Sequence, residues 1–312
     1  MTNPNTEYDS PWKEIIQLYF EDFMLFFFPQ VHSQIDWSRG FEFLDQELQQ
    51  VVRDAELGKR LVDKLVKVYR RTGEEIWVLV HIEIQAQEEG KFPERMFVYN
   101  YRIFDRYKRP VASLAVLADS SSTWRPNNFG YELFGCTVDF KFPVVKLVDY
   151  QQRISELEES RNPFATVVLA HLTALQTRSN RVERKVQKLA LVRRLYEKEF
   201  SREQVLNLLA FLDWMLTLPF ELEAEFRQDL EQLEQEQGMQ YITSFERIAR
   251  REELLGAIEL GLELKFGNEG LALMQEISVL DDIERLRAIK SGIKTVSSVS
   301  ELRQIYQSTT GE

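Results

Sequence analysis

Hydrophobic and polar positions recur with two different periods along this chain, and the period changes several times in its first half. Residues 10–28 have the 3.6-residue spacing of an amphipathic helix. Ser10 is placed to cap this helix, Pro11 suits its first position, and Pro29 follows its end. A second helix is expected over residues 43–61. The chain is therefore predicted to begin with two helices.

Strand signals dominate the part of the chain that follows. The runs 63–71 and 75–85 are rich in β-branched and aromatic residues, and the short Gly-containing segment between them predicts a β-hairpin. Residues 91–108 return to helical spacing. The apolar run 110–119 predicts a strand buried on both faces, and residues 131–149 predict one or two more strands. This part is expected to mix α and β structure.

Strand signals stop after about residue 150, and helical periodicity continues to the end of the chain. The expected helices cover residues 151–176, 181–198, 202–216, 219–236, 240–265, 269–277, 281–291 and 298–307. We therefore expect a mixed α/β domain over residues 8–150 and an all-α region over residues 151–312. No Gly/Ser-rich linker separates them, so the helices could pack directly on the sheet.

The net charge of the chain and its distribution limit how much of the surface could bind nucleic acid. Apolar residues make up 44% and charged residues 29%, as in soluble globular proteins. The net charge of −11 argues against a nucleic-acid coat over the whole surface. Basic residues nevertheless gather between Lys59 and Arg71 and between Arg178 and Arg194, whereas acidic residues dominate 220–237. The charge is segregated along the chain, and solvated helix faces are the simplest explanation for each run.

Two features bear on the cellular compartment. The most apolar run, Phe23 to Pro29, is too short to cross a bilayer, and the N-terminus lacks the pattern of a signal peptide. Cys136 is the single cysteine, which excludes a disulfide within the chain and a cysteine-only metal site. We therefore expect a cytoplasmic protein without a membrane partner. Cys136 itself is expected to be a small buried side chain.

The predicted hairpin can be aligned by matching its side chains. A register that pairs Arg71 with Glu75 brings apolar residues opposite apolar residues. It sets Val68 opposite Val78, Val66 opposite Val80, and Tyr69 opposite Trp77. The same register sets Asp63 opposite Glu83 at the open end of the hairpin. Two carboxylates are thus expected side by side.

Adjacent carboxylates are costly unless a positive charge lies between them. Mg²⁺, or Mn²⁺ in its place, would supply that charge, because it takes oxygen ligands and keeps several waters. The predicted metal ligands are Asp63, Glu83 and the backbone carbonyl of Ile84. Gln85 lies on the same side as Glu83 and could position a water, so the predicted catalytic residues are Asp63, Glu83 and Gln85. A metal held there can polarise a phosphate and activate a bound water.

An Asp on one strand followed by Glu-x-Gln on the next resembles the core of the PD-(D/E)XK nucleases, most of which have Lys at the third place. The segments around it are "YDSPWKEIIQLYFEDFMLFFFP", "VDKLVKVY", "HIEIQAQ", "ERMFVYNYRIFDRYKRPVASLAVLAD" and "NPFATVVLAHL". Together they resemble the recombination-promoting nuclease family, which includes transposase-like proteins, and in particular its cyanobacterial-type members. The resemblance covers about residues 7–175.

This resemblance implies an α/β fold with a restriction-endonuclease-like mixed sheet flanked by helices, followed by an all-α C-terminal region. It also implies a magnesium-dependent DNA endonuclease linked to recombination or mobile elements, with Asp63 and Glu83 as metal ligands. Gln85 takes the third motif position. Because Gln replaces Lys there, an inactive or weakly active nuclease-like fold that binds DNA or protein is the alternative.

A rival set has the same spacing and the more usual lysine. It consists of Asp119, Asp139 and Lys141, which are expected to be charges at strand ends in solvent. The hairpin set is preferred because its pairing brings the carboxylates together.

Partners follow from the basic residues and the helices. We expect the protein to bind DNA, and we also expect it to form a homodimer through its helical regions. Arg102 and Arg106 lie one turn apart on a predicted helix and could reach a phosphate. The candidate DNA contacts are Lys64, Lys67, Arg102 and Arg106. The aromatic residues expected mainly in the core of the same helix are Tyr99, Tyr101, Phe104 and Tyr107.

Overall fold

The computed structural model describes residues 9–53, 62–83, 91–237, 241–280, 282–296 and 298–307. Contacts divide the chain into two compact units, Met1–Gln228 and Asp229–Glu312. The division expected near residue 150 lies inside the first unit. Helices that follow residue 150 pack there against the N-terminal helices, so they belong to the same compact unit as the sheet.

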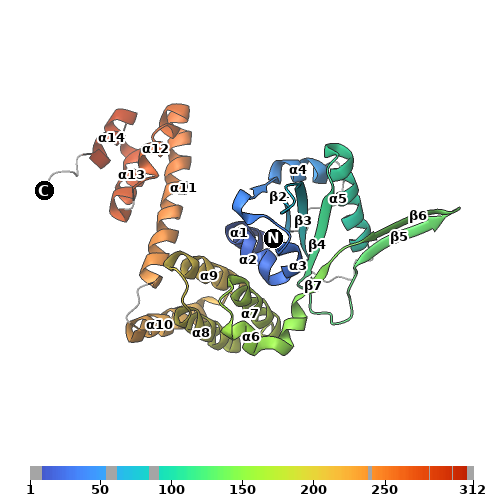
Figure 1. The fold of residues 1–312 in the computed structure, drawn as a ribbon. Helices are drawn as coiled ribbons and strands as arrows, with labels where there is room; N and C mark the ends of the chain where they lie inside the picture. The colour runs from blue at the N-terminus through green and yellow to red at the C-terminus, as the bar shows by residue number, and fades with distance from the viewer. Residues whose placement is uncertain are drawn as a thin grey trace. The chain divides into compact units, whose positions relative to one another are not determined.

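The first unit contains a mixed five-stranded sheet (Figure 1). Its strands in spatial order are β1 (Glu42–Phe43), β2 (Val62–Tyr69), β3 (Glu75–Glu83), β4 (Val111–Leu117) and β7 (Val144–Lys146). β1, β2 and β3 are antiparallel, whereas β3, β4 and β7 are parallel. A parallel pair needs a crossover, and α5 (Phe92–Tyr107) supplies it between β3 and β4. The mixed α/β class expected from the sequence is confirmed.

α4 (Asp45–Arg53) and α5 pack on one face of this sheet. The buried residues of α5 are Phe92, Met96, Tyr99 and Ile103, which recur at the helical spacing that predicted it. Tyr99 and Ile103 join a cluster with Leu65 and Leu79 of the sheet. The helix expected over residues 91–108 is therefore confirmed. The expectation for its aromatic residues is wrong at Tyr101 and Phe104, which are 54% and 49% exposed.

The helix expected over residues 10–28 is divided in two. α1 (Asp9–Leu18) and α2 (Phe20–Phe27) are separated by Tyr19, whose φ of −132° and ψ of 46° are not helical. The break lets Phe20 and Phe23 of α2 enter a buried aromatic cluster, where the Phe23 ring meets that of Phe164 at 5.3 Å. The short α3 (Pro29–His32) and η1 (Trp37–Arg39) follow.

The remaining helices of the first unit come after the sheet. They are η2 (Leu147–Arg153), α6 (Ile154–Glu159), α7 (Pro163–Gln176), α8 (Arg181–Glu197) and α9 (Arg202–Met215), and α10 (Phe220–Gln237) continues past the boundary between the units. α7 is the buried centre of this group, since every residue from Pro163 to Thr173 is buried. The basic run on α8 is largely paired inside the unit: Lys188 bonds to Asp213 at 2.7 Å.

A separate two-stranded ribbon precedes β7. It consists of β5 (Asn128–Leu133) and β6 (Cys136–Lys141), joined by a two-residue turn at Phe134 and Gly135. Both turn residues have positive φ, 52° and 80°, as a type I′ hairpin turn requires. The expected strand region over 131–149 is thus a hairpin followed by β7. Cys136 is exposed beside the turn, so the expectation that it is buried is wrong.

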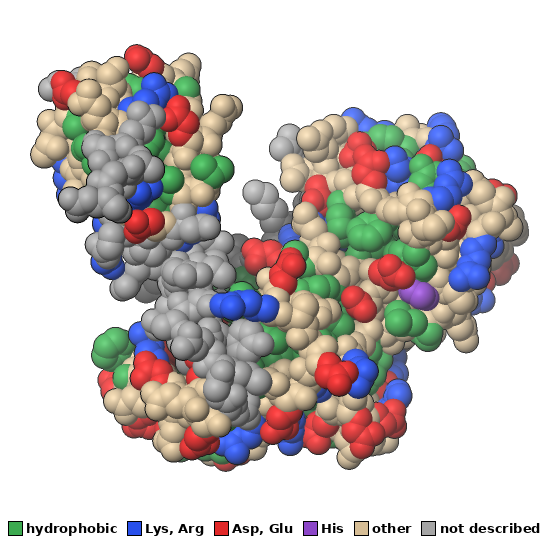
Figure 2. All heavy atoms as spheres, turned by 60° about the vertical axis from the view of Figure 1, so that its left-hand side comes forward, with side chains coloured by type: hydrophobic (Ala, Val, Ile, Leu, Met, Phe, Trp, Pro, Cys, Tyr) green, Lys and Arg blue, Asp and Glu red, His purple; other side chains and the backbone are tan. Residues whose placement is uncertain are grey.

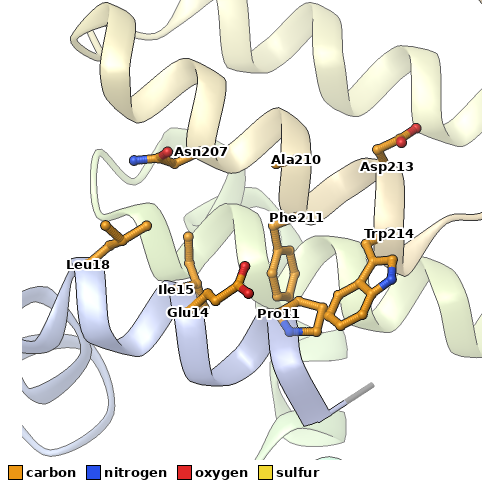
Figure 3. A pocket seen from close by; sticks show the side chains of 9 residues that line it. All are labelled: Pro11, Glu14, Ile15, Leu18, Asn207, Ala210, Phe211, Asp213 and Trp214. Carbon is orange, nitrogen blue, oxygen red and sulfur yellow. The ribbon is translucent and has the colours of Figure 1, made fainter. Parts of the chain in front are cut away.

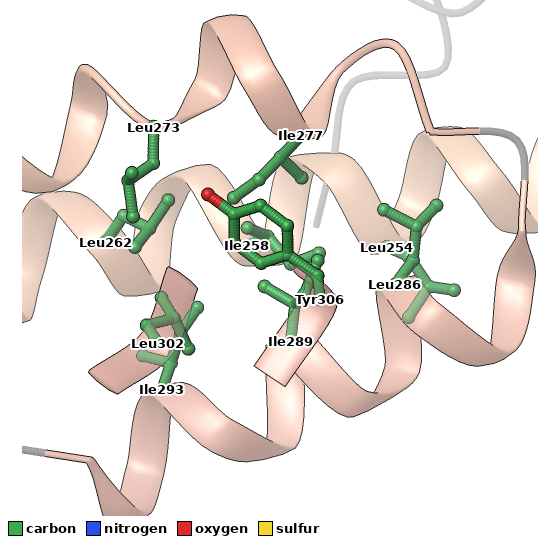
Figure 4. Packing of buried hydrophobic residues seen from close by; sticks show 10 residues of the cluster. All are labelled: Leu254, Ile258, Leu262, Leu273, Ile277, Leu286, Ile289, Ile293, Leu302 and Tyr306. Carbon is green, nitrogen blue, oxygen red and sulfur yellow. The ribbon is translucent and has the colours of Figure 1, made fainter. Parts of the chain in front are cut away.

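The second unit is helical, with α11 (Tyr241–Leu271), α12 (Met274–Ile277), α13 (Ile283–Thr295) and α14 (Val299–Gln307). Its apolar side chains converge on one core, as Figure 4 shows. Ile258, Leu262, Ile289 and Leu302 are fully buried there. α11 continues beyond the expected end at residue 265 but breaks at Gly267, whose φ of 57° favours glycine.

Candidate active site

Three parallel strands end at one edge of the sheet. Glu83, Leu117 and Lys146 form one row of Cα partners across β3, β4 and β7. β2 is antiparallel to β3, so its first residues, including Asp63, begin at this same edge. Ligands of open α/β sheets bind at the carboxyl ends of parallel strands. The predicted site residues Asp63 and Glu83 therefore occupy the edge where a ligand would be expected.

The hairpin register differs from the predicted one by two residues. Asp63 pairs with His81, and not with Glu83. The observed partners elsewhere are Val66 with Val78, Val68 with Ile76, Lys67 with Trp77, and Tyr69 with Glu75. The predicted register of Arg71 with Glu75 is wrong.

The reason lies in the turn. Arg70 donates its backbone N–H to the Glu74 carbonyl at 2.8 Å, which leaves Arg71, Thr72 and Gly73 as the loop. Gly73 has a φ of 92° and takes the last loop position, where a three-residue hairpin needs a left-handed residue. The predicted register placed Gly73 in the middle of the loop. Glycine's conformation, and not side-chain matching, therefore sets this register.

The shift changes the relation between the two predicted carboxylates. Glu83 occupies a position diagonal to Asp63, two residues beyond its partner His81. Diagonal positions in an antiparallel pair lie about 7–8 Å apart, within reach of long side chains. Ile84 and Gln85 lie outside the described residues. The side chains of Asp63, His81 and Glu83 likewise lie outside the described part of the structure, which gives only their backbone. Among the side chains that are described, no cluster of three or more His, Cys, Asp or Glu is placed to hold a metal.

The rival carboxylates do not form a site together. Asp119 follows β4 and is fully buried against Lys146 of β7, whose Nζ lies 2.7 and 2.9 Å from the two carboxylate oxygens. Lys146 also donates to the Trp124 carbonyl at 2.9 Å, so its three protons have acceptors. Asp139 and Lys141 pair with each other on the exposed ribbon. The lysine of this edge is therefore a buried structural partner.

His171 of α7 lies beneath the same edge of the sheet. Its Nε2 is 2.6 Å from the carbonyl of Ala118, the residue after β4. Burial lowers the pKa of His171 to about 4, so the ring is neutral at pH 7 and Nε2 donates this bond. Its Nδ1 and the indole nitrogen of Trp12, which contacts it edge-on, are buried without partners among the described residues. His171 therefore serves as a buried anchor between α7 and β4.

Two of the candidate DNA contacts are engaged by carboxylates. Lys64 is buried, and its Nζ bonds to Asp45 at 3.0 Å and to Gln17 at 3.1 Å. The expectation that Lys64 contacts DNA is therefore wrong, because the side chain points into the protein. Lys67 pairs with Glu42, which raises the pKa of its ammonium group.

The two arginine candidates lie on α5, as expected. Arg106 is exposed and donates to Gln50 at 2.8 Å, and Arg102 is half-buried. Figure 2 shows Lys and Arg scattered among Asp and Glu on the face in view, without a continuous basic surface.

A pocket of about 310 Å³ lies between α1 and α9 (Figure 3). Ile15 and Phe211 form its apolar floor, with Pro11, Glu14, Leu18, Asn207, Ala210, Asp213 and Trp214 around them. Asp213 is already bonded to Lys188. The predicted catalytic residues do not line this pocket, so it gives no support to the predicted site.

No protein-family model matches this chain, and neither the curated proteins nor the solved structures contain a significant match. Across the described residues, no helix is long and apolar enough to cross a membrane.

Proposed function

We propose that this protein is a metal-dependent DNA endonuclease built on a restriction-endonuclease-like sheet. The observation that carries the proposal is the placement of Asp63 and Glu83 on neighbouring strands, at the edge where β3, β4 and β7 end. The order of an N-terminal helix, an antiparallel β1–β2–β3 sheet, the crossover helix α5 and the parallel β4 supports it.

The metal would be held by Asp63 and Glu83, with the Ile84 carbonyl as a further oxygen. Such a ligand set leaves several positions to water, as Mg²⁺ prefers. When bound, the ion would polarise a DNA phosphate and lower the pKa of a bound water. Gln85 would orient that water, because an amide can hydrogen-bond but cannot serve as a general base.

The observed register adds His81 to this group, since it is the direct partner of Asp63. A nitrogen ligand would favour a first-row transition ion such as Mn²⁺ over Mg²⁺. Comparing the two ions, in wild type and in His81→Phe, therefore tests whether the histidine is a ligand.

Nicking of supercoiled plasmid with Mg²⁺ or Mn²⁺ tests the function. Wild type is expected to nick, whereas Asp63→Asn and Glu83→Gln are expected to lose activity. Glu74→Gln is the matched control, because Glu74 is an exposed carboxylate in the turn of the same hairpin, paired only locally with Arg70. Unchanged nicking by both site variants would refute the assigned residues.

The second candidate function is that of a nuclease-like fold that binds DNA or a protein partner but does not cut DNA. The pairing of Lys64 and Lys67 with carboxylates favours it, as does the net charge of −11. Titration calorimetry with Mn²⁺ separates the two. If the wild type binds Mn²⁺ and nicks DNA, and Asp63→Asn abolishes the metal binding, the nuclease is supported. If the wild type neither binds Mn²⁺ nor nicks DNA, the binding module is supported.

A further inference from the structure

The β5–β6 ribbon has one apolar face and one polar face. Successive pairs in a two-stranded ladder point to opposite faces. The pairs on one face are Phe129–Phe140, Tyr131–Val138 and Leu133–Cys136, and those on the other are Asn128–Lys141, Gly130–Asp139 and Glu132–Thr137. Such a division is typical of a sheet that is covered on one side.

Among the described residues, α5 covers the inner end of the apolar face. Phe97 of α5 packs against Phe129 at 5.1 Å and against Phe140 at 5.7 Å. Further out, Tyr131 and Leu133 are 53% and 60% exposed. Figure 1 shows the ribbon extending beyond the five-stranded sheet. A two-stranded hairpin with an uncovered apolar face is marginally stable in water, so this end calls for a partner surface.

Phe134 at the tip of the ribbon is a second, independent indication that this end of the ribbon contacts a partner. Its ring is fully exposed, and its φ is 52°. A bulky side chain in the left-handed region is a strained outlier, whereas Asn or Gly would fit this turn without strain. Strained residues of this kind cluster at active sites, ligand clamps and switch regions. The ring of Phe134 is therefore outside the chain's own core and is available for contact with a partner.

The apolar surface continues on α5. Phe97, Tyr101 and Phe104 recur at helical spacing, and the Tyr101 ring stacks on Phe97 at 6.3 Å. The exposed ring of Phe104 continues the strip. Two apolar strips thus meet at Phe97, one along the helix and one along the ribbon. We refer to the exposed side chains of both strips as the ribbon–helix patch: Tyr101, Phe104, Tyr131, Leu133 and Phe134.

The size of the ribbon–helix patch matches a protein interface. A large apolar side chain exposes about 150–250 Å² when it is fully uncovered. With the observed exposures, the patch amounts to roughly 600 Å², which is at the upper end of the range for the largest apolar patch on a typical monomer. A standard interface buries about 800 Å² on each partner, including its polar rim.

We propose that the ribbon–helix patch binds a second copy of this chain. With the two ribbons antiparallel about a twofold axis, each tip covers the α5 strip of the other copy, so apolar side chains cover apolar side chains. Two copies of the patch would together bury roughly 1,200 Å², the lower end of the range for specific protein interfaces. DNA is a poor occupant, because the only basic residue of the ribbon, Lys141, is paired with Asp139.

Light scattering with size-exclusion chromatography tests the proposal on the full chain. Wild type is expected at twice the 36.9 kDa of one chain, and Leu133→Lys at 36.9 kDa. Thr137→Lys is the matched control: it puts the same side chain near the same tip, but on the polar face opposite Glu132. It is expected to remain at twice the chain mass. Leu133→Lys is expected to weaken association about tenfold or more.

The outcome can also overturn the proposal. A wild type of single-chain mass at every concentration refutes it, and co-sedimentation of that monomer with phosphatidylserine vesicles would assign the patch to a lipid surface instead. A Leu133→Lys variant that keeps the doubled mass would place the dimer contact elsewhere, for example on the C-terminal helices. Far-UV circular dichroism checks that the variants are folded. None of these outcomes depends on nuclease activity.

Discussion

Asp119→Asn should remove a large part of the stability of the first unit. The wild-type carboxylate is completely buried and faces Lys146, which is also almost fully buried. The substitution keeps the shape of the side chain but leaves the ammonium group without a counter-charge or water. Breaking a buried ion pair in this way costs about 3–5 kcal/mol. Typical domains are stable by only about 5–15 kcal/mol, so the loss should be obvious.

Urea denaturation followed by circular dichroism measures the effect. The double variant Asp119→Leu with Lys146→Met removes both charges and should be more stable than Asp119→Asn, although the Trp124 carbonyl loses one donor. Asp139→Asn is the control, because the Asp139–Lys141 pair is exposed on the ribbon and should contribute little to stability. If Asp119→Asn lost no more than this control, the buried pair would be accessible to water and the reasoning would fail.

Three further predictions concern single residues. The pKa of His171 is 6.5 in the unfolded chain and about 4 in the folded protein, so stability should fall by up to about 3 kcal/mol as the pH drops through this window. In urea titrations at pH 7 and pH 4.5, His171→Gln should lose this dependence on pH. Phe134→Asn should give a single-chain mass and a free energy of unfolding about 1 kcal/mol above that of Leu133→Lys, which is also expected to be monomeric; a value no higher than that of Leu133→Lys would contradict the strain. Asn162 caps α7 and also bonds to the Asp22 carbonyl, so Asn162→Ala should cost about 1–2 kcal/mol in thermal denaturation, and a cost near zero would argue against the cap.

Local periodicity predicted the elements well. α5, α8, α9, α10, α13 and α14 lie close to their expected ranges, because their apolar residues recur at helical spacing. The break at Tyr19 was missed, since α2 turns to bury Phe23 against Phe164 of α7, more than 130 residues later in the chain. Long-range packing of this kind leaves no local signal. The division of the helix expected over residues 151–176 into η2, α6 and α7 was missed as well.

The candidate site was predicted in part. Asp63 and Glu83 do reach the same edge of the sheet, but matching apolar residues could not select between registers that differ by two, because such a shift keeps every side chain on its face. The left-handed conformation of Gly73 determines which of these registers the hairpin adopts. The strands of the ribbon were expected, but their exposed apolar face was not, because an alternating pattern resembles an ordinary half-buried strand whether or not anything covers it.

The burial of α7 has a consequence for synthesis on the ribosome. The apolar rings of α2 are made early, yet the partners that cover them include Phe164 of α7, and Tyr19 bonds to Asn207 of α9 at 2.8 Å. At translation rates of about 5–20 residues per second, roughly 7 to 28 s separate Phe23 from Phe164, and roughly 10 to 40 s separate Tyr19 from Asn207. During that time the nascent chain carries uncovered phenylalanines. Chaperone dependence should therefore end only when α9 has emerged, well after the whole sheet has been made.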